Sequence, residues 1–291
     1  MYDHYAKQNN EMQNPSACDL LVVYRISSGG YTKEKPDYIT KESCLWNFIR
    51  CLQDYVSSRP NYASRWQLRV ICDNCSPALR QFVSATTSAL PSGRVTIVET
   101  SHGNGAASFR DGLAHATRPE YVDSCGVYFV EDDYLHTQGA LEAILEGLSL
   151  ADFSTGYDHP DKYGKMISKD GNLQQLPAVP LVSGGMERGG GVLLGRTGHF
   201  RVTNSTTMTF ASTAGTLRKC KDTISRWVSG THPHDFHMWL DLSQEQGSRL
   251  VCTLPARSTH GETRFLAPHP AGGLSWESIG REAEKRARRK K

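Results

Sequence analysis

The sequence predicts an α/β protein with a mostly parallel, Rossmann-like sheet that is flanked by helices. Short apolar runs, of the kind that form buried parallel strands, alternate with longer segments of helical spacing. Up to residue 150 this alternation occurs four times, at intervals of roughly 30 residues, the length of a right-handed strand–helix–strand unit. The alternation stops near residue 152, so we expect a less regular second half within the same domain.

The first half should contain four strands, each followed by a helix. We expect strands at 20–26, 68–72, 95–98 and 127–130, and helices at 41–56, from 76, at 103–116 and at 141–150. In the first of these helices, Leu45, Phe48 and Leu52 share one apolar face. The second begins with Ser76 and Pro77, in the usual order of capping residue and proline.

The second half has fewer regular signals. Residues 152–176 are polar and rich in Gly, Asp and Lys, which predicts a loop. We expect an edge strand at 177–182, because of its prolines, further strands at 192–194 and 250–254, and helices at 211–228 and 234–242. The predicted organisation is an N-terminal segment at 1–18, halves at 19–150 and 151–267, and a Pro/Gly-rich, then basic tail at 268–291.

The composition is that of an ordinary globular protein, with 291 residues, 22% charged and 38% hydrophobic. Apolar stretches are far shorter than the ~20 residues that cross a bilayer, and residues 1–14 lack the apolar core of a signal peptide. We therefore expect a cytoplasmic protein. Residues 281–291 contain seven basic and two acidic side chains. Such a tail suits nucleic acid or an anionic membrane, or is a frayed, solvated terminus, which we favour.

The eight cysteines are scattered, which favours reduced thiols over a disulfide framework. Cys72 and Cys75 form a single CxxC motif. Without a second such motif in the sequence, a zinc knuckle is not expected, and a redox role has weak support.

Three consecutive carboxylates, Glu131, Asp132 and Asp133, follow the apolar run at 127–130. Adjacent carboxylates repel one another, and a hard divalent cation with oxygen ligands would relieve that repulsion. The carboxyl ends of strands are also where open α/β sheets bind their ligands. A solvated turn after a strand is the alternative interpretation of the cluster.

The order of these landmarks, over roughly residues 20–262, resembles the GT-A-fold glycosyltransferases, most closely those of the family-2 type. Strand ends, a glycine-rich loop and the acidic cluster occur in the order of that family. The resemblance implies that the nucleotide-sugar donor contacts Tyr24, Arg25, Ser27, Asp73, Gly103, Asn104, Gly105, Glu131 and Asp132. Glycines let the backbone approach a nucleotide, and a helix N-terminus favours its negative charge.

The same resemblance implies that Asp133 ligates Mn²⁺ or Mg²⁺, with His260 as a further ligand. His234 and His237, three residues apart, are an alternative pair. Asp235 would be the general base of an inverting transfer, taking the proton of the acceptor hydroxyl. The glycine-rich segment at 184–191 would frame the acceptor, with contacts from Arg188, Gly190 and Gly191.

The sequence thus predicts a metal-dependent glycosyltransferase that uses a nucleotide-diphosphate sugar. Its acceptor would be a hydroxyl of a glycan or of a modified nucleic-acid base, the latter suggested by the basic tail. A nucleotidyltransferase is an alternative, although residues 28–33 fit its glycine-rich, basic signature only in part. A binding module without activity is a third possibility, against which the intact carboxylates argue.

Overall fold

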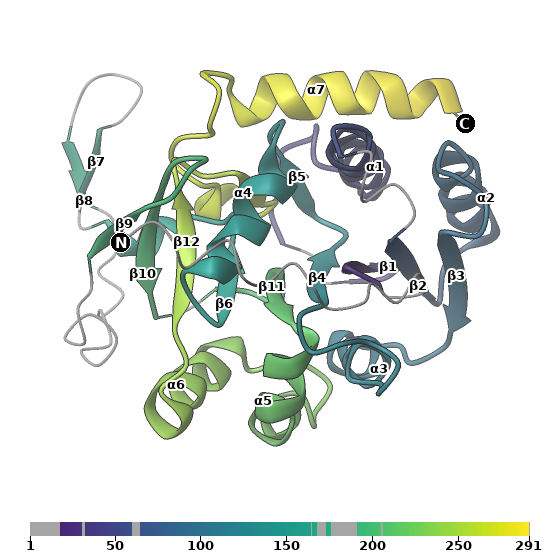
Figure 1. Cartoon of the computed structure of the whole chain (residues 1–291). Helices are drawn as coiled ribbons and strands as arrows, with labels where there is room; N and C mark the ends of the chain where they lie inside the picture. Colours follow the sequence, from purple (N-terminus) through teal and green to yellow (C-terminus); the bar gives the residue numbers. More distant parts are fainter. Residues whose placement is uncertain are drawn as a thin grey trace.

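A sheet of nine strands forms the centre of the molecule, in the order β3-β2-β1-β4-β11-β6-β12-β10-β9, with helices on both faces (Figure 1). The computed structural model describes residues 18–30, 33–59, 65–163, 165–167, 173–175, 191–204 and 206–290. The strands are β1 (Leu20–Ser27), β2 (Trp66–Asp73), β3 (Val95–Thr100), β4 (Gly126–Glu131), β6 (Phe153–Thr155), β9 (Val192–Leu194), β10 (His199–Thr203), β11 (Phe210–Thr213) and β12 (Leu250–Leu254). The predicted α/β class is therefore confirmed.

Most strands of this sheet run in one direction. β1 is parallel to both β2 and β4, β2 is parallel to β3, and β12 is parallel to β6. Within the sheet, β10 and β11 run the opposite way, since each pairs antiparallel with both of its neighbours. The predicted helix at 211–228 was wrong at its start, because β11 occupies residues 210–213 before α5 begins.

The helices lie on the two faces of the sheet in two groups. They are α1 (Lys41–Ser57), α2 (Pro77–Thr87), α3 (Gly105–Ala116), α4 (Ala140–Glu146), α5 (Ala214–Trp227), α6 (Asp235–Gln246) and α7 (Trp276–Ala287), besides short 3₁₀ turns. Buried residues of α1, α2, α4 and α7 form one core, and those of α3, α5 and α6 form the other. We call these the α1 face and the α3 face of the sheet.

The central strands β1 and β4 are mostly apolar up to their carboxyl ends because both of their faces are covered. Side chains alternate between the faces of a strand. In β1, Val22 and Tyr24 belong to the core of the α1 face, whereas Leu21 and Val23 belong to that of the α3 face. β4 alternates in the same way, and this alternation decides where the carboxylates at its end point.

Two small antiparallel sheets accompany the large one. β5 (Tyr134–His136) pairs with β13 (Ser258–His260), and β7 (Lys165–Ile167) pairs with β8 (Leu173–Gln175). The loop predicted at 152–176 was therefore wrong where β6, β7 and β8 form. β5 starts directly after the acidic cluster, so its pairing brings a segment from near residue 260 to that cluster.

The C-terminal segment is an ordered helix, so the expectation of a frayed terminus was wrong. Ser275 caps α7 through a capping box with Ser278, and Trp276 is buried. α7 lies across α1 (Figure 1). Within α7, Arg281 pairs with Asp37, and Arg286 with Glu282, so part of its basic charge is neutralised inside the protein.

In the ranges that the structure describes, no helix is long and apolar enough to span a bilayer. The strand predicted at 177–182 lies outside those ranges.

Candidate active site

The three consecutive carboxylates lie at the carboxyl end of β4 and point in different directions. Glu131 ends β4 and follows the alternation of Val127 and Phe129, which places its side chain toward the α3 face. Asp132 follows Tyr128 and Val130 toward the α1 face. Asp133 leads into β5 and meets the neighbouring strand β13. Each carboxylate therefore has its own partners.

Glu131 is held by a cation and a hydroxyl. Its carboxylate lies 3.2 Å from the guanidinium of Arg25, its neighbour on β1, and accepts a hydrogen bond of 3.2 Å from Thr209 Oγ1. Arg25 is only 7% exposed, donates to the carbonyl of Gly105 at 3.1 Å and lies over the ring of Phe109. Arg25 thus connects the acidic cluster to the start of α3.

Asp132 is held by the segment that follows β1. Its Oδ2 accepts hydrogen bonds from Lys41 Nζ and from the backbone N–H of Ser27, both at 2.9 Å. Burial raises the pKa of Asp132. The neighbouring charge of Asp133 raises this pKa further, whereas Lys41 lowers it. Ser27 therefore contributes a backbone contact to the cluster, and its hydroxyl donates to the carbonyl of Gly29.

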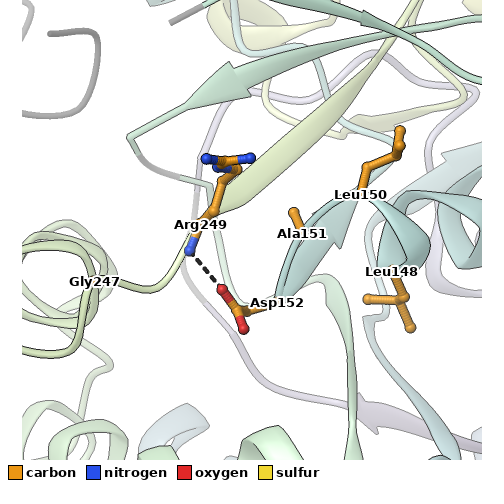
Figure 2. A pocket seen from close by; sticks show the side chains of 6 residues that line it. All are labelled: Leu148, Leu150, Ala151, Asp152, Gly247 and Arg249. Carbon is orange, nitrogen blue, oxygen red and sulfur yellow. Dashed lines mark hydrogen bonds between the residues drawn. The ribbon is translucent and has the colours of Figure 1, made fainter. Parts of the chain in front are cut away.

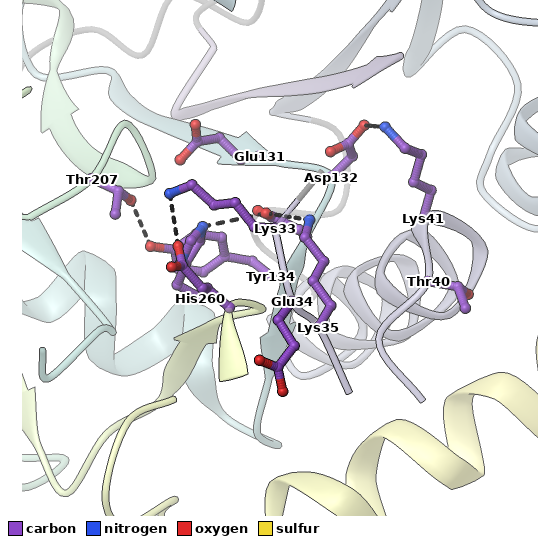
Figure 3. A network of polar contacts seen from close by, with 12 residues as sticks. Lys33, Glu34, Lys35, Thr40, Lys41, Glu131, Asp132, Tyr134, Thr207 and His260 are labelled. Carbon is purple, nitrogen blue, oxygen red and sulfur yellow. Dashed lines mark hydrogen bonds and ion pairs between the residues drawn. The ribbon is translucent and has the colours of Figure 1, made fainter. Parts of the chain in front are cut away.

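One oxygen of Asp133 contacts both a lysine and a histidine, Lys35 and His260, which are shown in Figure 3. Its Oδ2 lies 2.7 Å from Lys35 Nζ and 3.3 Å from His260 Nε2. Burial alone would raise the pKa of Asp133, but His260 and Lys35 more than offset it and hold the pKa well below its usual range. Burial lowers the pKa of His260, yet Asp133 outweighs this effect and the pKa is raised. The pair predicted from sequence is thus in direct contact.

His260 reaches Asp133 because a glycine follows it. A Cβ atom at Gly261 would lie 2.7 Å from both the carbonyl oxygen of Asp133 and Cγ2 of Ile39. Contacts shorter than 3.0 Å require the backbone or the neighbouring side chain to move, so only glycine lets the chain pass this closely.

Asp235 is the first residue of α6, on the α3 face of the sheet. It is half-buried, and its Oδ1 accepts from the N–H of Phe236 at 2.7 Å. Burial raises the pKa of Asp235, and Glu131 raises it further, while His159 and His260 act in the opposite direction. Asp235 therefore lies within electrostatic reach of the acidic cluster, with the raised basicity that suits a proton acceptor.

The glycine-rich loop before α3 is fixed by the residues expected to bind the donor. Both oxygens of Asp73 accept from the N–H of Gly103, at 3.1 and 3.0 Å. Asn104 caps α3 by accepting from Ala107 N–H at 2.8 Å. Gly105 accepts the hydrogen bond from Arg25. Asp73, Asn104 and Arg25 thus set the shape of this loop through their own contacts.

Other predicted site residues lie elsewhere. Tyr24 is fully buried against Phe48, with ring centroids 5.3 Å apart, so the structure places it in the core and not in the site. Gly191 is exposed next to β9, at the opposite edge of the sheet from β3 and several strands from β4. Arg188 and Gly190 lie outside the described residues.

The donor set around Asp133 fits a divalent cation in part. A carboxylate oxygen and an imidazole nitrogen suit Mn²⁺, and Mg²⁺ is commonly held by one or two carboxylates together with substrate phosphates and water. Lys35 Nζ, a cation, already stands at the same oxygen. Over the described ranges, however, no three His, Cys, Asp or Glu side chains are arranged as a complete metal site. The alternative pair, His234 and His237, has ring centroids 6.3 Å apart.

Several site residues were not predicted from the sequence. Lys35 and Lys41 meet carboxylates about a hundred positions away, Thr209 holds Glu131, and His159 acts on Asp235. Such long-range pairs leave no local pattern. The one available signal was the position of both lysines in the segment after the first strand, close to where the sheet binds ligands.

A shallow hollow of about 370 Å³ lies away from this cluster (Figure 2). Leu148, Leu150, Ala151, Asp152, Gly247 and Arg249 line it, and Asp152 Oδ2 accepts from the N–H of Arg249 at 2.9 Å. Asp152 and Arg249 precede the parallel strands β6 and β12, so the hollow lies at the amino ends of these strands. The acidic cluster lies at the opposite, carboxyl end of the sheet.

The fold of this chain is similar to the GT-A fold of solved glycosyltransferases. The structure of GalNAc-T7 with UDP, GalNAc and Mn²⁺ is similar with a TM-score of 0.50 and 11% identity, over 93% of this chain and 47% of that chain. The galactosyltransferase LgtC, with donor and acceptor sugar analogues, has a TM-score of 0.46 and 11% identity, over 91% of this chain and 95% of that one.

The chain thus spans about half the length of GalNAc-T7. No protein-family model and no curated protein sequence matches the chain. At this level of identity the similarity establishes the fold and leaves the reaction to be argued from the site.

Proposed function

We propose that the chain is a glycosyltransferase that moves a sugar from a nucleotide-diphosphate donor to a hydroxyl of a saccharide acceptor. The observation that carries the proposal is the contact of Asp133 with His260 at the carboxyl end of β4, with Glu131 two residues before Asp133. This end of an open α/β sheet is where ligands bind. Asp235, from a third segment of the chain, is within electrostatic reach of Glu131 and His260.

Each side chain has a chemical task in this proposal. Asp133 and His260 would hold a divalent cation, which would stabilise the leaving diphosphate. Asp235, whose pKa is raised by burial, accepts the proton of the acceptor hydroxyl as that oxygen attacks the anomeric carbon. A single displacement with an external base inverts the anomeric centre. Arg25 keeps the loop at Gly105 next to Glu131, where the donor binds.

A saccharide acceptor is favoured over a nucleic-acid base. Binding of nucleic acid depends on basic side chains that are free to neutralise phosphates. In α7, Arg281 pairs with Asp37 and Arg288 with Glu284, so part of the basic charge of this helix is balanced by surface ion pairs within the protein.

A thermal-shift screen of nucleoside diphosphates and their sugars, with and without Mn²⁺, tests the proposal. UDP is the first probe, because it is bound in GalNAc-T7. A ligand at about 100 times its Kd should stabilise the protein by ~2.7 kcal/mol. Asp133→Asn should remove the Mn²⁺-dependent part of this gain. If no nucleoside diphosphate raises the melting temperature, the donor assignment is wrong, and release of pyrophosphate from a nucleoside triphosphate would favour a nucleotidyltransferase.

A further inference from the structure

Three lysines from the segment that leads into α1 pair with three carboxylates, and Figure 3 shows Lys33, Lys35 and Lys41 together with Asp132. Lys33 pairs with Glu262 at 2.7 Å, Lys35 with Asp133 at 2.7 Å and Lys41 with Asp132 at 2.9 Å. Residues 33–41, which we call the lysine segment, thus supply each of these carboxylates with a positive charge.

The backbone of the lysine segment is fixed without help from the side chain of Lys35. The carbonyl of Glu34 accepts from both the N–H and the hydroxyl of Thr263, at 2.9 and 3.1 Å. Ile39 is buried and meets Gly261. The lysine segment is therefore attached to the chain that follows His260, and the flexible stem of Lys35 can move its ammonium group while the backbone stays in place.

Lys35 contacts the carboxylate oxygen that also faces His260, where a divalent cation held by both Asp133 and His260 would bind. Its Nζ contacts Oδ2 of Asp133, the same oxygen that faces His260 Nε2 at 3.3 Å. The side chains of Lys35 and Asp133 are 29% and 16% exposed, so water screens their interaction only in part. An ammonium group and a divalent cation on one carboxylate oxygen would repel each other strongly, so only one of them can occupy it.

We propose that Lys35 is a positioning residue with two alternative partners. In the unliganded site its ammonium group pairs with Asp133, at the position of the cation. When a divalent cation binds Asp133, the ammonium group of Lys35 leaves it and pairs with the donor diphosphate. This inference rests on the proposed function, since it needs the cation and the diphosphate to arrive at Asp133. The exchange keeps each negative charge paired: the cation neutralises Asp133, and the released ammonium group meets the phosphate oxygens that accompany the cation. Lysine suits this task, because it binds phosphate as a compact point charge.

Two affinities of Lys35→Met test the exchange. Binding of Mn²⁺ alone, measured from the electron paramagnetic resonance signal of free Mn²⁺, should become about tenfold tighter, because the competing cation is gone. Binding of UDP at saturating Mn²⁺, measured by calorimetry, should become about tenfold weaker, on the scale of one charge-assisted hydrogen bond. Lys35→Gln should behave in the same way, and it preserves a polar side chain in case the methionine disturbs the segment.

Lys41→Met is the matched control, because it removes the same charge from the neighbouring Asp132. Its Mn²⁺ affinity should stay within about threefold of wild type, since Lys41 does not contact the proposed ligand oxygen. An equal gain in Lys41→Met would mean that overall charge, and not the contact with Asp133, controls Mn²⁺ binding, and the exchange would be refuted. Unchanged Mn²⁺ or UDP affinity in Lys35→Met would also refute it. The Mn²⁺ measurement needs no nucleotide, so failure of the proposed donor is a separate result.

Discussion

At the scale of single residues, the partner of each carboxylate decides its chemistry. The pKa of Asp133 is lowered because His260 and Lys35 outweigh the effect of its burial, whereas burial raises the pKa of Asp235. The acidic cluster could be predicted from the sequence, because consecutive carboxylates after an apolar run form a local pattern, whereas the role of Asp235 as a base was implied only by the resemblance and stays a prediction. Lys35 could not, because a contact between residues 35 and 133 depends on the fold.

Asp235→Asn should separate binding from catalysis. The amide cannot accept the proton of the acceptor hydroxyl, so the rate of sugar transfer should fall by about 10²- to 10⁴-fold. The Kd of the nucleotide, measured by calorimetry, should remain within a few-fold of wild type, because Asp235 faces the acceptor in the proposed reaction. A variant that keeps its transfer rate would show that another group is the base.

His136 should make the fold sensitive to acid. It is 1% exposed, its Nε2 lies 2.7 Å from the hydroxyl of Tyr128, and burial lowers its pKa to about 3. Unfolded histidine titrates near 6.5, so below that pH the unfolded chain binds a proton that the folded chain does not. The contribution of His136 is therefore complete above pH ~6.5 and is lost as pH falls toward about 3, with a slope of at most about 1.4 kcal/mol per pH unit.

Urea unfolding at pH 7 and pH 5 measures this slope. His136→Gln has no titrating ring, and its free energy of unfolding should depend less steeply on pH than that of wild type. His115, whose pKa burial lowers to about 4, titrates in both proteins, so the difference between them isolates His136. Equal slopes would mean that His136 does not remain neutral in the folded protein.

At the scale of elements, the apolar and amphipathic patterns of the sequence predicted those strands and helices that are long enough to show such a pattern. The first four strands and their helices lie where they were expected, within a few residues, and most of them contain a continuous set of buried side chains; β3, whose residues are half-buried or exposed, is the exception among the strands. The three-residue strands β5, β6 and β13 were missed. Such strands are too short to show a period, and they form because a neighbouring strand already offers its hydrogen-bonding groups.

The terminal helix α7 should contribute strongly to stability. Trp276 is 5% exposed and donates from its indole to the carbonyl of Ala267 at 2.7 Å. Trp276→Ala should lower the free energy of unfolding by about 3–5 kcal/mol, through lost burial and a cavity. Lys285→Ala, on the exposed side of the same helix, should change it by less than about 0.5 kcal/mol. Similar values for the two variants in chemical denaturation would show that α7 is not part of the core.

At the scale of the whole molecule, the sheet has a central and a peripheral part. β1 lies between β2 and β4 and is covered on both faces, whereas β9 is an edge strand whose three residues are half-buried or exposed. The composition and the strand–helix repeat predicted this layered architecture. They did not predict the reversed strands β10 and β11, because strand direction is set by connections that the repeat does not encode.

Native-state hydrogen exchange should show that the central strands of the sheet are more stable than its edge strand β9. The amides of β1 should exchange only through global unfolding, because their hydrogen bonds are shielded by two cores. The amides of β9 should exchange through local opening, at least about 100-fold faster than those of β1. This ratio corresponds to a difference of ~2.7 kcal/mol in the free energy of opening. Equal protection of β1 and β9 would mean that the sheet opens as one cooperative unit.

The pairing of β5 with β13 has a consequence for the order in which the protein is made. Asp133 is synthesised long before His260, and the two meet only when the segment after β12 folds back along β5. A chain emerging from the ribosome can form β1 to β4 and still hold half of its proposed cation site. The nascent protein should therefore complete the pair of Asp133 and His260 late, only after β12 and β13 have been made.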